Sequence, residues 1–245
     1  MKAHFKIDEI KLEFKNSVFS SSDLYNFYLQ NETTLNISTF RWRVHKLKEN
    51  NAIYSPKRGF FAVNNKKTFS PTIDKELSFI FTMLKRKFPY TNFCIWRTAW
   101  LNDYMVHQPL TNNIIVEIEK EAVTAAFSLL QITTSNNIFL NPSMKEMDLY
   151  VIGGLDNIII KKLNSSSPIT EIDGIKIPKI EKIIVDLFAD NIIFLTYQGA
   201  ELKNIYKEMF TNFKINLSTI KRYATRRNSF THLYSNLKEY FKIIN

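Results

Sequence analysis

The residues best suited to phosphoryl transfer are Glu171 and Asp173, two carboxylates one residue apart that follow Gly153-Gly154 along the chain. Enzymes that transfer nucleotides bind the triphosphate with a glycine turn and hold Mg²⁺ with paired carboxylates. Here the glycines lead into an apolar segment typical of a strand, whereas the phosphates need a helix N-terminus. "EID" before "GIKIP" (174–178) is more simply a turn between two strands, so we assign neither carboxylate a catalytic role.

A second acidic group lies in "VEIEK" (116–120). A metal-dependent nuclease needs an acidic residue followed by a strand that carries Glu-x-Lys, and this segment has two carboxylates and a lysine at a different spacing. Strand alternation places Glu117 and Glu119 on one face and Ile118 on the other, which predicts a half-exposed strand. This group therefore gives little support to a nuclease.

Metal ligands and reactive thiols are sparse. The four histidines (His4, His45, His107 and His232) show no ligand spacing. The single cysteine lies in the apolar segment "NFCIW" (92–96), which predicts a buried, inert thiol and excludes an internal disulfide. Five glycines in 245 residues supply a phosphate-cradling loop poorly, and no Walker, dinucleotide or serine-elbow motif is present. We expect no catalytic residue, no metal and no cofactor.

The strongest chemical signal is the basic and aromatic stretch "STFRWRVHKLKENNAIYSPKRGFFAV" (38–63). Phe40, Val44 and Leu47 recur at helical spacing and predict one core-facing stripe. Arginine can bond O6 and N7 of guanine, and serine or threonine can contact bases or phosphates. The candidate DNA contacts on this helix are Ser38, Thr39, Arg41, Trp42, Arg43, His45 and Lys46.

A hairpin follows this helix. "AIYSP" and "GFFAV" alternate as two short strands around Lys57-Arg58-Gly59, where the glycine can take the positive φ of a turn. Lys57 and Arg58 at the tip suit phosphate or minor-groove contact. Taken alone, the basic helix could be an ordinary solvated face with Trp42 partly in the core. The adjoining hairpin favours DNA binding.

Charge is concentrated in two regions of the chain. Overall, 33 Lys and Arg residues against 23 Asp and Glu residues give a formal charge of +10. Residues 36–67 hold eight basic residues and one acidic residue, residues 196–245 hold nine and three, and residues 71–195 hold 12 and 14. This separation favours a polyanionic partner. The candidate second basic surface comprises Lys221, Arg222, Arg226 and Arg227.

The elements that must position these residues form an α+β fold. Helices over 5–14, 24–30 and 36–49 followed by the hairpin have the order of a winged helix-turn-helix, which we expect at residues 1–68. A second domain over 72–245 is expected to be mixed α/β over 73–178 and mostly helical and basic over 179–245. Its expected helices in the first part are 73–87, 97–105 and 121–131, and its expected strands are 92–96, 113–119, 137–140, 148–152, 157–161 and 174–178.

The composition bears on the compartment. No run approaches the ~20 apolar residues of a membrane span. The N-terminal "MKAHFKIDEIKLEF" lacks the apolar core of a signal peptide. We expect a soluble protein of the cytoplasm with no membrane partner.

With this order of elements, the chain resembles the AbiEi-type family of bacterial antitoxins and transcriptional regulators. Residues 38–63 are similar to that family's third helix and wing, and "CIWRTAWLNDYM" (94–105) to its strand and short helix. "GIKIPKIEKIIVDLFAD" (174–190) is similar to its strand and helix with an early glutamate and a late Val-Asp-Leu, here Glu181 and Asp186. For those two residues, helix capping or ion pairing is the simpler role. Few glycines and Asn-rich turns depart from the commoner pattern.

The resemblance implies a winged helix that represses its own operon by binding double-stranded DNA at promoter repeats. It also implies that the second domain counteracts a nucleotidyltransferase-like toxin, often without a stable complex, in a type IV toxin–antitoxin system of phage defence. By position it makes Arg41, Trp42, Lys57 and Arg58 DNA contacts. Two alternatives stay open: a nucleotidyltransferase-like or nuclease-like enzyme targeted by the winged helix, and a basic scaffold without DNA specificity.

Overall fold

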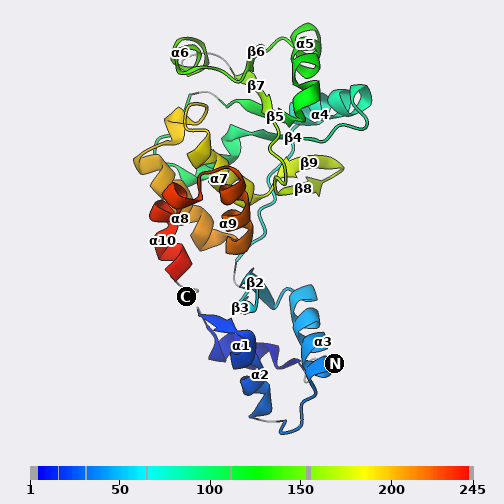
Figure 1. Ribbon diagram of the computed structural model, residues 1–245, viewed down its shortest axis with the longest axis vertical. Coiled ribbons are helices and arrows are strands. Elements are labelled where there is room, and N and C mark those ends of the chain that lie inside the picture. Colours follow the sequence, from blue (N-terminus) through cyan, green and yellow to red (C-terminus); the bar gives the residue numbers. More distant parts are fainter. Residues whose placement is uncertain are drawn as a thin grey trace. The chain divides into compact units, whose positions relative to one another are not determined.

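The structure is a computed structural model that describes residues 5–15, 17–30, 32–64, 66–110, 112–152 and 156–242. The fold class is α+β, and the chain divides into two compact units (Figure 1). The first unit comprises Met1–Thr68, Asn212–Ser218 and Leu237–Asn245, and the second comprises Phe69–Thr211 and Thr219–Asn236.

Residues 212–218 belong with the first unit, although the sequence assigns the whole chain after 72 to the second domain. The Lys67 amide donates to the Asn212 carbonyl, and the Lys214 amide donates to the Lys67 carbonyl, each at 2.9 Å. The Lys214 ammonium also donates to the Asn51 side chain at 3.2 Å. Composition could not predict this pairing, because it joins residues that are far apart in the sequence.

The first unit contains three helices and a three-stranded antiparallel sheet. Its elements are α1 (Ile7–Glu13), β1 (Val18–Ser20), α2 (Ser21–Leu29), α3 (Ile37–Glu49), β2 (Ile53–Lys57) and β3 (Phe60–Val63). The strand order is β1-β3-β2. The three helices and the hairpin match the sequence prediction. The sequence does not predict β1, because three residues are too few to show strand alternation.

Local sequence sets the starts of α2 and α3. Ser20 and Asp23 form a capping box at α2, and the Asn36 side chain accepts from the Ser38 amide at 2.8 Å at α3. The core that holds these helices on the sheet is aromatic-rich and includes Ile10, Phe19, Leu24, Tyr28, Phe40, Leu47, Ile53 and Phe61.

The second unit is built around a four-stranded mixed sheet. The elements from residue 69 to the hairpin are α4 (Lys75–Lys87), β4 (Phe93–Arg97), η2 (Thr98–Tyr104), β5 (Ile114–Ile118), η3 (Lys120–Ala122), α5 (Val123–Thr133), β6 (Asn137–Leu140), α6 (Met144–Glu146), η4 (Met147–Val151), β7 (Asn157–Lys162), β8 (Ile169–Ile172) and β9 (Ile175–Pro178). The chain continues as α7 (Ile180–Ala189), η5 (Leu195–Tyr197), α8 (Ala200–Asn212), α9 (Leu217–Arg226) and α10 (Phe230–Lys242). This helical tail agrees with the expectation for 179–245.

The sheet has the order β4-β5-β7-β6, with β4 antiparallel to β5 and with β5, β7 and β6 parallel to one another. On β5, Ile114, Val116 and Ile118 belong to the apolar core shared with α4 and α5. Strand alternation turns Ile115 and Glu117 to the opposite face, where α7 lies (Figure 1). Both faces are covered, as expected for strands in parallel pairs.

Two local predictions in this unit need correction. The strand expected at 148–152 is helical, because Ser143 and Glu146 form a capping box that starts α6 and the helix runs on through η4. The segment 169–172, for which the sequence predicts no strand, is strand β8 and pairs with β9. The polar residues around β8 obscure the strand alternation in its sequence.

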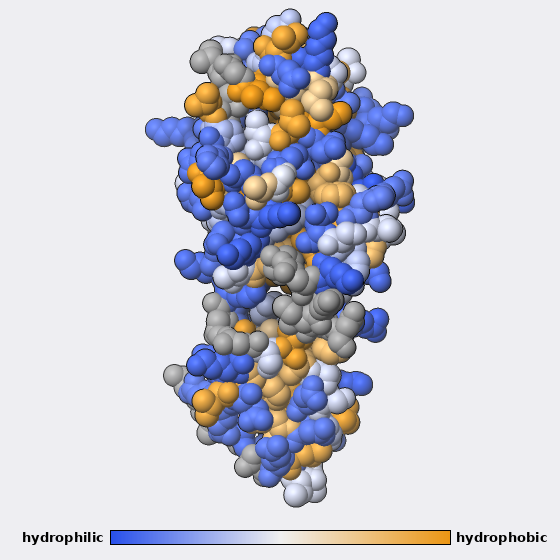
Figure 2. Space-filling view, turned by 90° about the vertical axis from the view of Figure 1, so that its left-hand side faces the viewer, coloured by the Kyte–Doolittle hydropathy of each residue, from blue (hydrophilic) through white to orange (hydrophobic). Residues whose placement is uncertain are grey.

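Apolar surface gathers at the end of this unit that carries α6 and β6, as the space-filling view shows (Figure 2). Leu140, Met144 and Leu149 are among the exposed large apolar residues there. No helix within the described ranges is both long and apolar enough to cross a membrane.

Candidate functional site

Helix α3 has an inward and an outward face. Phe40 and Leu47 are buried in the core of the first unit, and Val44 is partly buried against it. Ser38, Thr39 and Arg41 are exposed on the other side of the N-terminal half. The predicted core stripe is therefore confirmed.

Trp42 and His45 extend the outward face. The Trp42 side chain is 52% exposed, and its ring lies 5.4 Å from the ring centroid of Phe5. Trp42 therefore packs on Phe5 with one part and keeps the other part in solvent. His45 is exposed and lies 3.9 Å from a Glu49 carboxylate oxygen. Lys46 pairs with the same carboxylate at 2.7 Å, so its charge is already compensated.

Arg43 does not lie on the outward face, and its prediction as a DNA contact is corrected. Its side chain is only 8% exposed, and its guanidinium donates to both carboxylate oxygens of Glu32 at 2.9 Å. The same group lies 4.9 Å from the centroid of the Tyr28 ring. Position 43 is three residues after Phe40 and four before Leu47, which places it on the helix face that packs.

The hairpin tip presents two cations. Arg58 is exposed, and the Lys57 ammonium lies 5.2 Å from the Phe60 ring centroid. Gly59 has a φ of 79°, a backbone conformation that a side chain would strain. The Gly59 carbonyl accepts from the Ser21 amide at 2.8 Å, so the tip is tied to the start of α2. α3 and the hairpin are therefore held by one small core with defined positions.

The predicted second basic surface is only partly a surface. Lys221, Arg222 and Arg226 are exposed. Arg227 is not: its side chain is 10% exposed, and it pairs with Asp190 at 2.7 Å and with Asp186. Its place on the surface is therefore corrected, because carboxylates of α7 and its C-terminal end already hold its charge.

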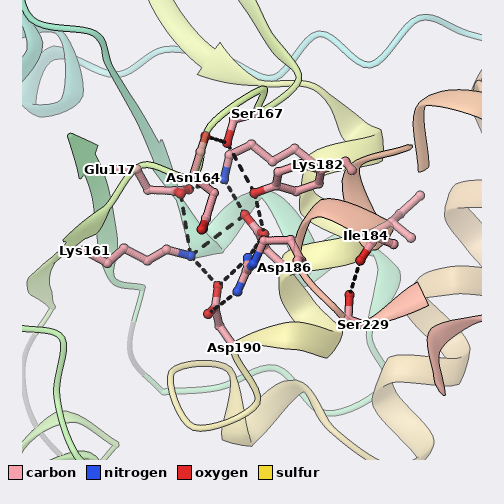
Figure 3. Close-up of polar contacts among 12 residues, drawn as sticks. Glu117, Lys161, Asn164, Ser167, Lys182, Ile184, Asp186, Asp190 and Ser229 are labelled. Atoms are coloured by element: carbon pink, nitrogen blue, oxygen red, sulfur yellow. Dashed lines mark hydrogen bonds and ion pairs between the residues drawn. The ribbon is translucent and has the colours of Figure 1, made fainter. Parts of the chain in front are cut away.

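Arg227 belongs to an ionic cluster on the α7 side of the sheet. We use this name for Glu117, Lys161, Lys182, Asp186, Asp190 and Arg227. Figure 3 shows the carboxylates and lysines of this cluster turned toward one another. Glu117 of β5 and Lys161 of β7 are direct cross-strand neighbours in the parallel ladder. Lys182 and Asp186 are four residues apart on α7, so both side chains point to the sheet from one helix face.

Lys182 is the centre of the ionic cluster. Its ammonium donates to Glu117 at 2.5 Å and to Asp186, and its side chain has no exposed area. Lys161 lies 3.6 Å from Glu117 and donates to Asp190. The Tyr223 hydroxyl donates to Asp186 at 3.0 Å. These contacts join β5, β7 and α7 to the end of α9.

The charges of the ionic cluster balance, with three carboxylates and three cations. Burial opposes the charged form of Lys182, but Asp186 and Glu117 prevail and raise its pKa well above the ordinary lysine value. Burial likewise opposes ionisation of Asp186, yet Lys182, Lys161 and Arg227 lower its pKa to about 2. Lys182 and Asp186 are therefore held in their charged forms, and each group of the ionic cluster forms an ion pair with at least one other member. Such mutual pairing is typical of a structural ion-pair network.

The sequence did not reveal the ionic cluster. The interpretation of 116–120 as a half-exposed strand was wrong, because Glu117 is completely buried. The sequence did contain a signal for the ionic cluster. Glu117 is the one acidic residue in the otherwise apolar β5, and Lys161 lies near the end of the apolar β7. Charges within buried strands need partners. For Asp186, the ion pairing that the sequence suggested is present, and its partner four residues earlier is Lys182.

The carboxylates that the sequence offers for an enzyme, Glu171 and Asp173, are not members of the ionic cluster. Glu171 and Asp173 are exposed at the β8–β9 hairpin, where Asp173 and Gly174 have φ values of 50° and 80°. Asp173 and Gly174 form the turn between two strands that the sequence suggested, whereas Glu171 lies in β8 opposite Lys176. Gly153-Gly154 and His4 lie outside the described residues. Within the described ranges, no three His, Cys, Asp or Glu residues are grouped to hold a metal ion.

Cys94 of β4 lies next to the ionic cluster, because it is the cross-strand neighbour of Glu117. It is buried opposite Glu117, as the apolar segment predicts. Burial raises the pKa of the Cys94 thiol. The group is therefore held as a neutral thiol and is a poor nucleophile.

Comparison with known protein families gives a match to a family of unknown function, DUF6577, over residues 39–243. This range is most of the chain. The chain belongs to this family. The DUF6577 match begins within α3 and includes the hairpin, the sheet and the ionic cluster. No curated protein matches the chain.

Proposed function

We propose that the protein is a DNA-binding transcriptional regulator that contacts double-stranded DNA with α3 and the β2–β3 hairpin. The observation that carries the proposal is the exposed N-terminal half of α3, with Ser38, Thr39 and Arg41, followed by a hairpin with Lys57 and Arg58 at its tip. The order α1-β1-α2-α3-β2-β3 supports a winged helix-turn-helix. In that motif the second helix of the pair enters the major groove.

The balance of charges on this surface supports a phosphate-bearing partner such as DNA. Glu32 compensates Arg43, and Glu49 compensates Lys46. Arg41, Lys48, Lys57 and Arg58 remain without a carboxylate partner among the described residues. The first turn of α3 holds no acidic residue. The helix N-terminus therefore adds its positive dipole end to the same surface, which favours phosphate oxygens.

The side chains divide into two roles. Arg41 can bond a guanine edge in a bidentate way, and Trp42 offers a half-exposed ring to a sugar or a thymine methyl. Lys48, Lys57 and Arg58 suit phosphates, where they add affinity without reading sequence. The proposed regulator thus reads bases with α3 and holds the backbone with the hairpin.

The resemblance to AbiEi-type regulators extends the proposal to a role in the cell. The protein would repress its own operon and act as a non-enzymatic cytoplasmic antitoxin against a nucleotidyltransferase-like toxin. Discovery of a reading frame of that type beside the gene would support this extension, and co-expression of the two proteins should then restore growth to cells that the toxin arrests. Growth arrest that is the same with and without this protein would contradict the antitoxin role and leave DNA binding standing.

The experiment for DNA binding is a fluorescence anisotropy titration of a duplex from the upstream promoter across a salt series. Three uncompensated cations that meet phosphates, Lys48, Lys57 and Arg58, give a slope of log affinity against log salt of about −3 per protomer. The affinity should then fall on the order of 40-fold between about 50 and 200 mM salt. Binding that does not depend on salt, or no binding to that duplex, would refute the proposal.

A further inference from the structure

A large open hollow lies beside the carboxyl ends of two neighbouring parallel strands of the second unit. Its volume is about 860 Å³. Glu119 and Lys120, which follow β5, and Lys162 and Leu163 at the end of β7 form part of its wall. In open α/β sheets, ligands bind outside the carboxyl ends of the strands. The volume falls within the range of about 300–1,000 Å³ that small-molecule sites occupy.

Four cations line this hollow: Lys120, Lys162, Lys176 and Arg226. Three carboxylates line it too, but no ion pair within the described ranges takes up Lys120, Lys162 or Arg226. Glu119 instead accepts from the Asn92 side-chain amide at 2.7 Å. These three cations therefore keep their charge available for a ligand.

A serine loop adds hydrogen-bond donors beside the cations. Ser165, Ser166 and Ser167 line the hollow, and the Arg226 guanidinium donates to the Ser165 hydroxyl at 2.7 Å. Ser167 already donates its hydroxyl proton to the Asn164 carbonyl at 2.7 Å, so the hydroxyls of Ser165 and Ser166 supply the donors for a ligand. Leu163 and Ile169 give the wall an apolar part. Hydroxyls and a guanidinium beside apolar surface suit a ligand with a phosphate group and a flat apolar body.

The ionic cluster anchors part of the wall of this hollow. Arg227, the neighbour of Arg226, is held by Asp186 and Asp190 (Figure 3). Tyr223, one turn earlier on α9, contacts Ser167 at 3.3 Å through its hydroxyl. The end of α9 and the serine loop are thus both anchored, so Arg226 and the loop hydroxyls keep their spacing. Such pre-organisation lowers the entropy cost of binding.

We propose that this hollow binds a phosphate-bearing ligand of nucleotide size, held by Arg226, Lys162 and Lys120 and by the serine-loop hydroxyls. The phosphate can belong to a free nucleotide or to the backbone of a single-stranded RNA. The site is separate from the proposed DNA surface and does not depend on it.

The experiment measures binding to the full chain by calorimetry with three probes: ATP, adenosine and an eight-nucleotide single-stranded RNA. ATP or the RNA should bind and adenosine should not, since phosphate supplies the main contacts. Arg226→Glu and Lys162→Glu should each weaken that binding by at least about tenfold. Both side chains are exposed, so the fold is expected to survive the changes.

The matched control is Lys221→Glu, an equal charge reversal at an exposed position of α9 that does not line the hollow. It should change the affinity by less than about twofold, which excludes a general effect of net charge. The pair Arg41→Ala and Arg58→Ala removes the proposed DNA contacts and should leave binding of the probes intact. Binding of ATP alone identifies a nucleotide site, and binding of the RNA alone identifies a strand-backbone site.

The proposal is overturned if neither ATP nor the RNA binds at about 1 mM, the weak end of specific affinity. It is also overturned if adenosine binds as well as ATP, or if both Arg226→Glu and Lys162→Glu bind like the unchanged protein. Circular dichroism of each variant shows whether the fold is retained, so a loss of binding is read only from folded protein.

Discussion

At the scale of single residues, Arg41 and Arg43 have opposite environments although they are two positions apart on α3. Arg41 is exposed, whereas Arg43 is buried and forms a bidentate pair with Glu32. The sequence places both in one basic run, because composition does not tell which face a charge occupies. The position relative to Phe40 and Leu47, and the presence of Glu32, distinguish the exposed Arg41 from the buried, paired Arg43.

Replacement of Arg43 by methionine should lower the stability of the first unit. The change removes the two charge-assisted hydrogen bonds between Arg43 and Glu32, at a cost of about 1–3 kcal/mol. Urea unfolding followed by circular dichroism measures the free energy of unfolding. Arg41→Met is the matched control and should change it by less than about 0.5 kcal/mol. Equal losses in both variants would contradict the division of α3 into two faces.

Replacement of Lys182, at the centre of the ionic cluster, should lower the stability of the fold more than replacement of Lys179, the N-cap residue of α7. Lys182→Met leaves Glu117 and Asp186 buried without their nearest cation, which costs about 3–5 kcal/mol when one partner of a buried pair is removed. Lys179, three residues earlier, is exposed and provides the control Lys179→Met. Thermal unfolding compares the two variants. A similar melting temperature for both would show that the cluster contributes no stability.

The lowered pKa of Asp186 predicts how the stability of the fold changes at acid pH. Its pKa is lowered to about 2 in the folded chain from an ordinary value of 3.8. A lowered folded pKa means that the stabilisation is present above about pH 4 and is lost as pH falls toward 2. Asp186→Asn should be less stable than the unchanged protein at pH 7, and the difference should shrink between pH 4 and 2. Urea unfolding at a series of pH values tests this, and a difference that is constant with pH would contradict it.

At the scale of elements, we expect the hairpin to supply affinity for DNA and α3 to supply discrimination between DNA sequences. The double change Lys57→Ala and Arg58→Ala should weaken binding to promoter and scrambled duplexes alike. The salt slope should fall in magnitude by about 1 for each phosphate that the variant no longer neutralises. Anisotropy titrations of both duplexes over a salt series measure this. Selective weakening of promoter binding, with the scrambled duplex unaffected, would mean that the hairpin reads bases instead.

Elements with strong local signals were predicted, among them the strands at 92–96, 113–119, 137–140, 157–161 and 174–178, whereas the short strands β1 and β8 were not. The helical spacing of Phe40, Val44 and Leu47 and the glycine in the hairpin tip identify α3 and β2–β3 from the sequence alone. The apolar run at 148–152 suggested a strand, but a capping box directly upstream makes it helical. Short strands such as β1 gain most of their stability from a partner strand, so their own residues carry little signal.

At the scale of the whole molecule, the chain order could be predicted but the ends of its units could not. The sequence predicts a basic N-terminal unit, a near-neutral middle and a helical tail. It does not predict that residues 212–218 bond to Lys67 of the first unit. Nor does it predict the ionic cluster, because Glu117, Lys161 and Asp186 meet only when strand register and helix docking are known. The DUF6577 match, which runs from 39 to 243, includes the hairpin and the ionic cluster alike.

The central claim is that α3 and the hairpin form one DNA-reading surface, and the ratio of affinities for the promoter duplex and a scrambled duplex tests it most directly. The unchanged protein should prefer the promoter. Arg41→Ala should lower that ratio by about tenfold, because a bidentate contact to guanine is worth about 1–3 kcal/mol. Lys221→Ala, a cation of the second unit, should leave the ratio unchanged. If the unchanged protein binds both duplexes equally, or if Arg41→Ala keeps the full ratio, α3 does not read DNA.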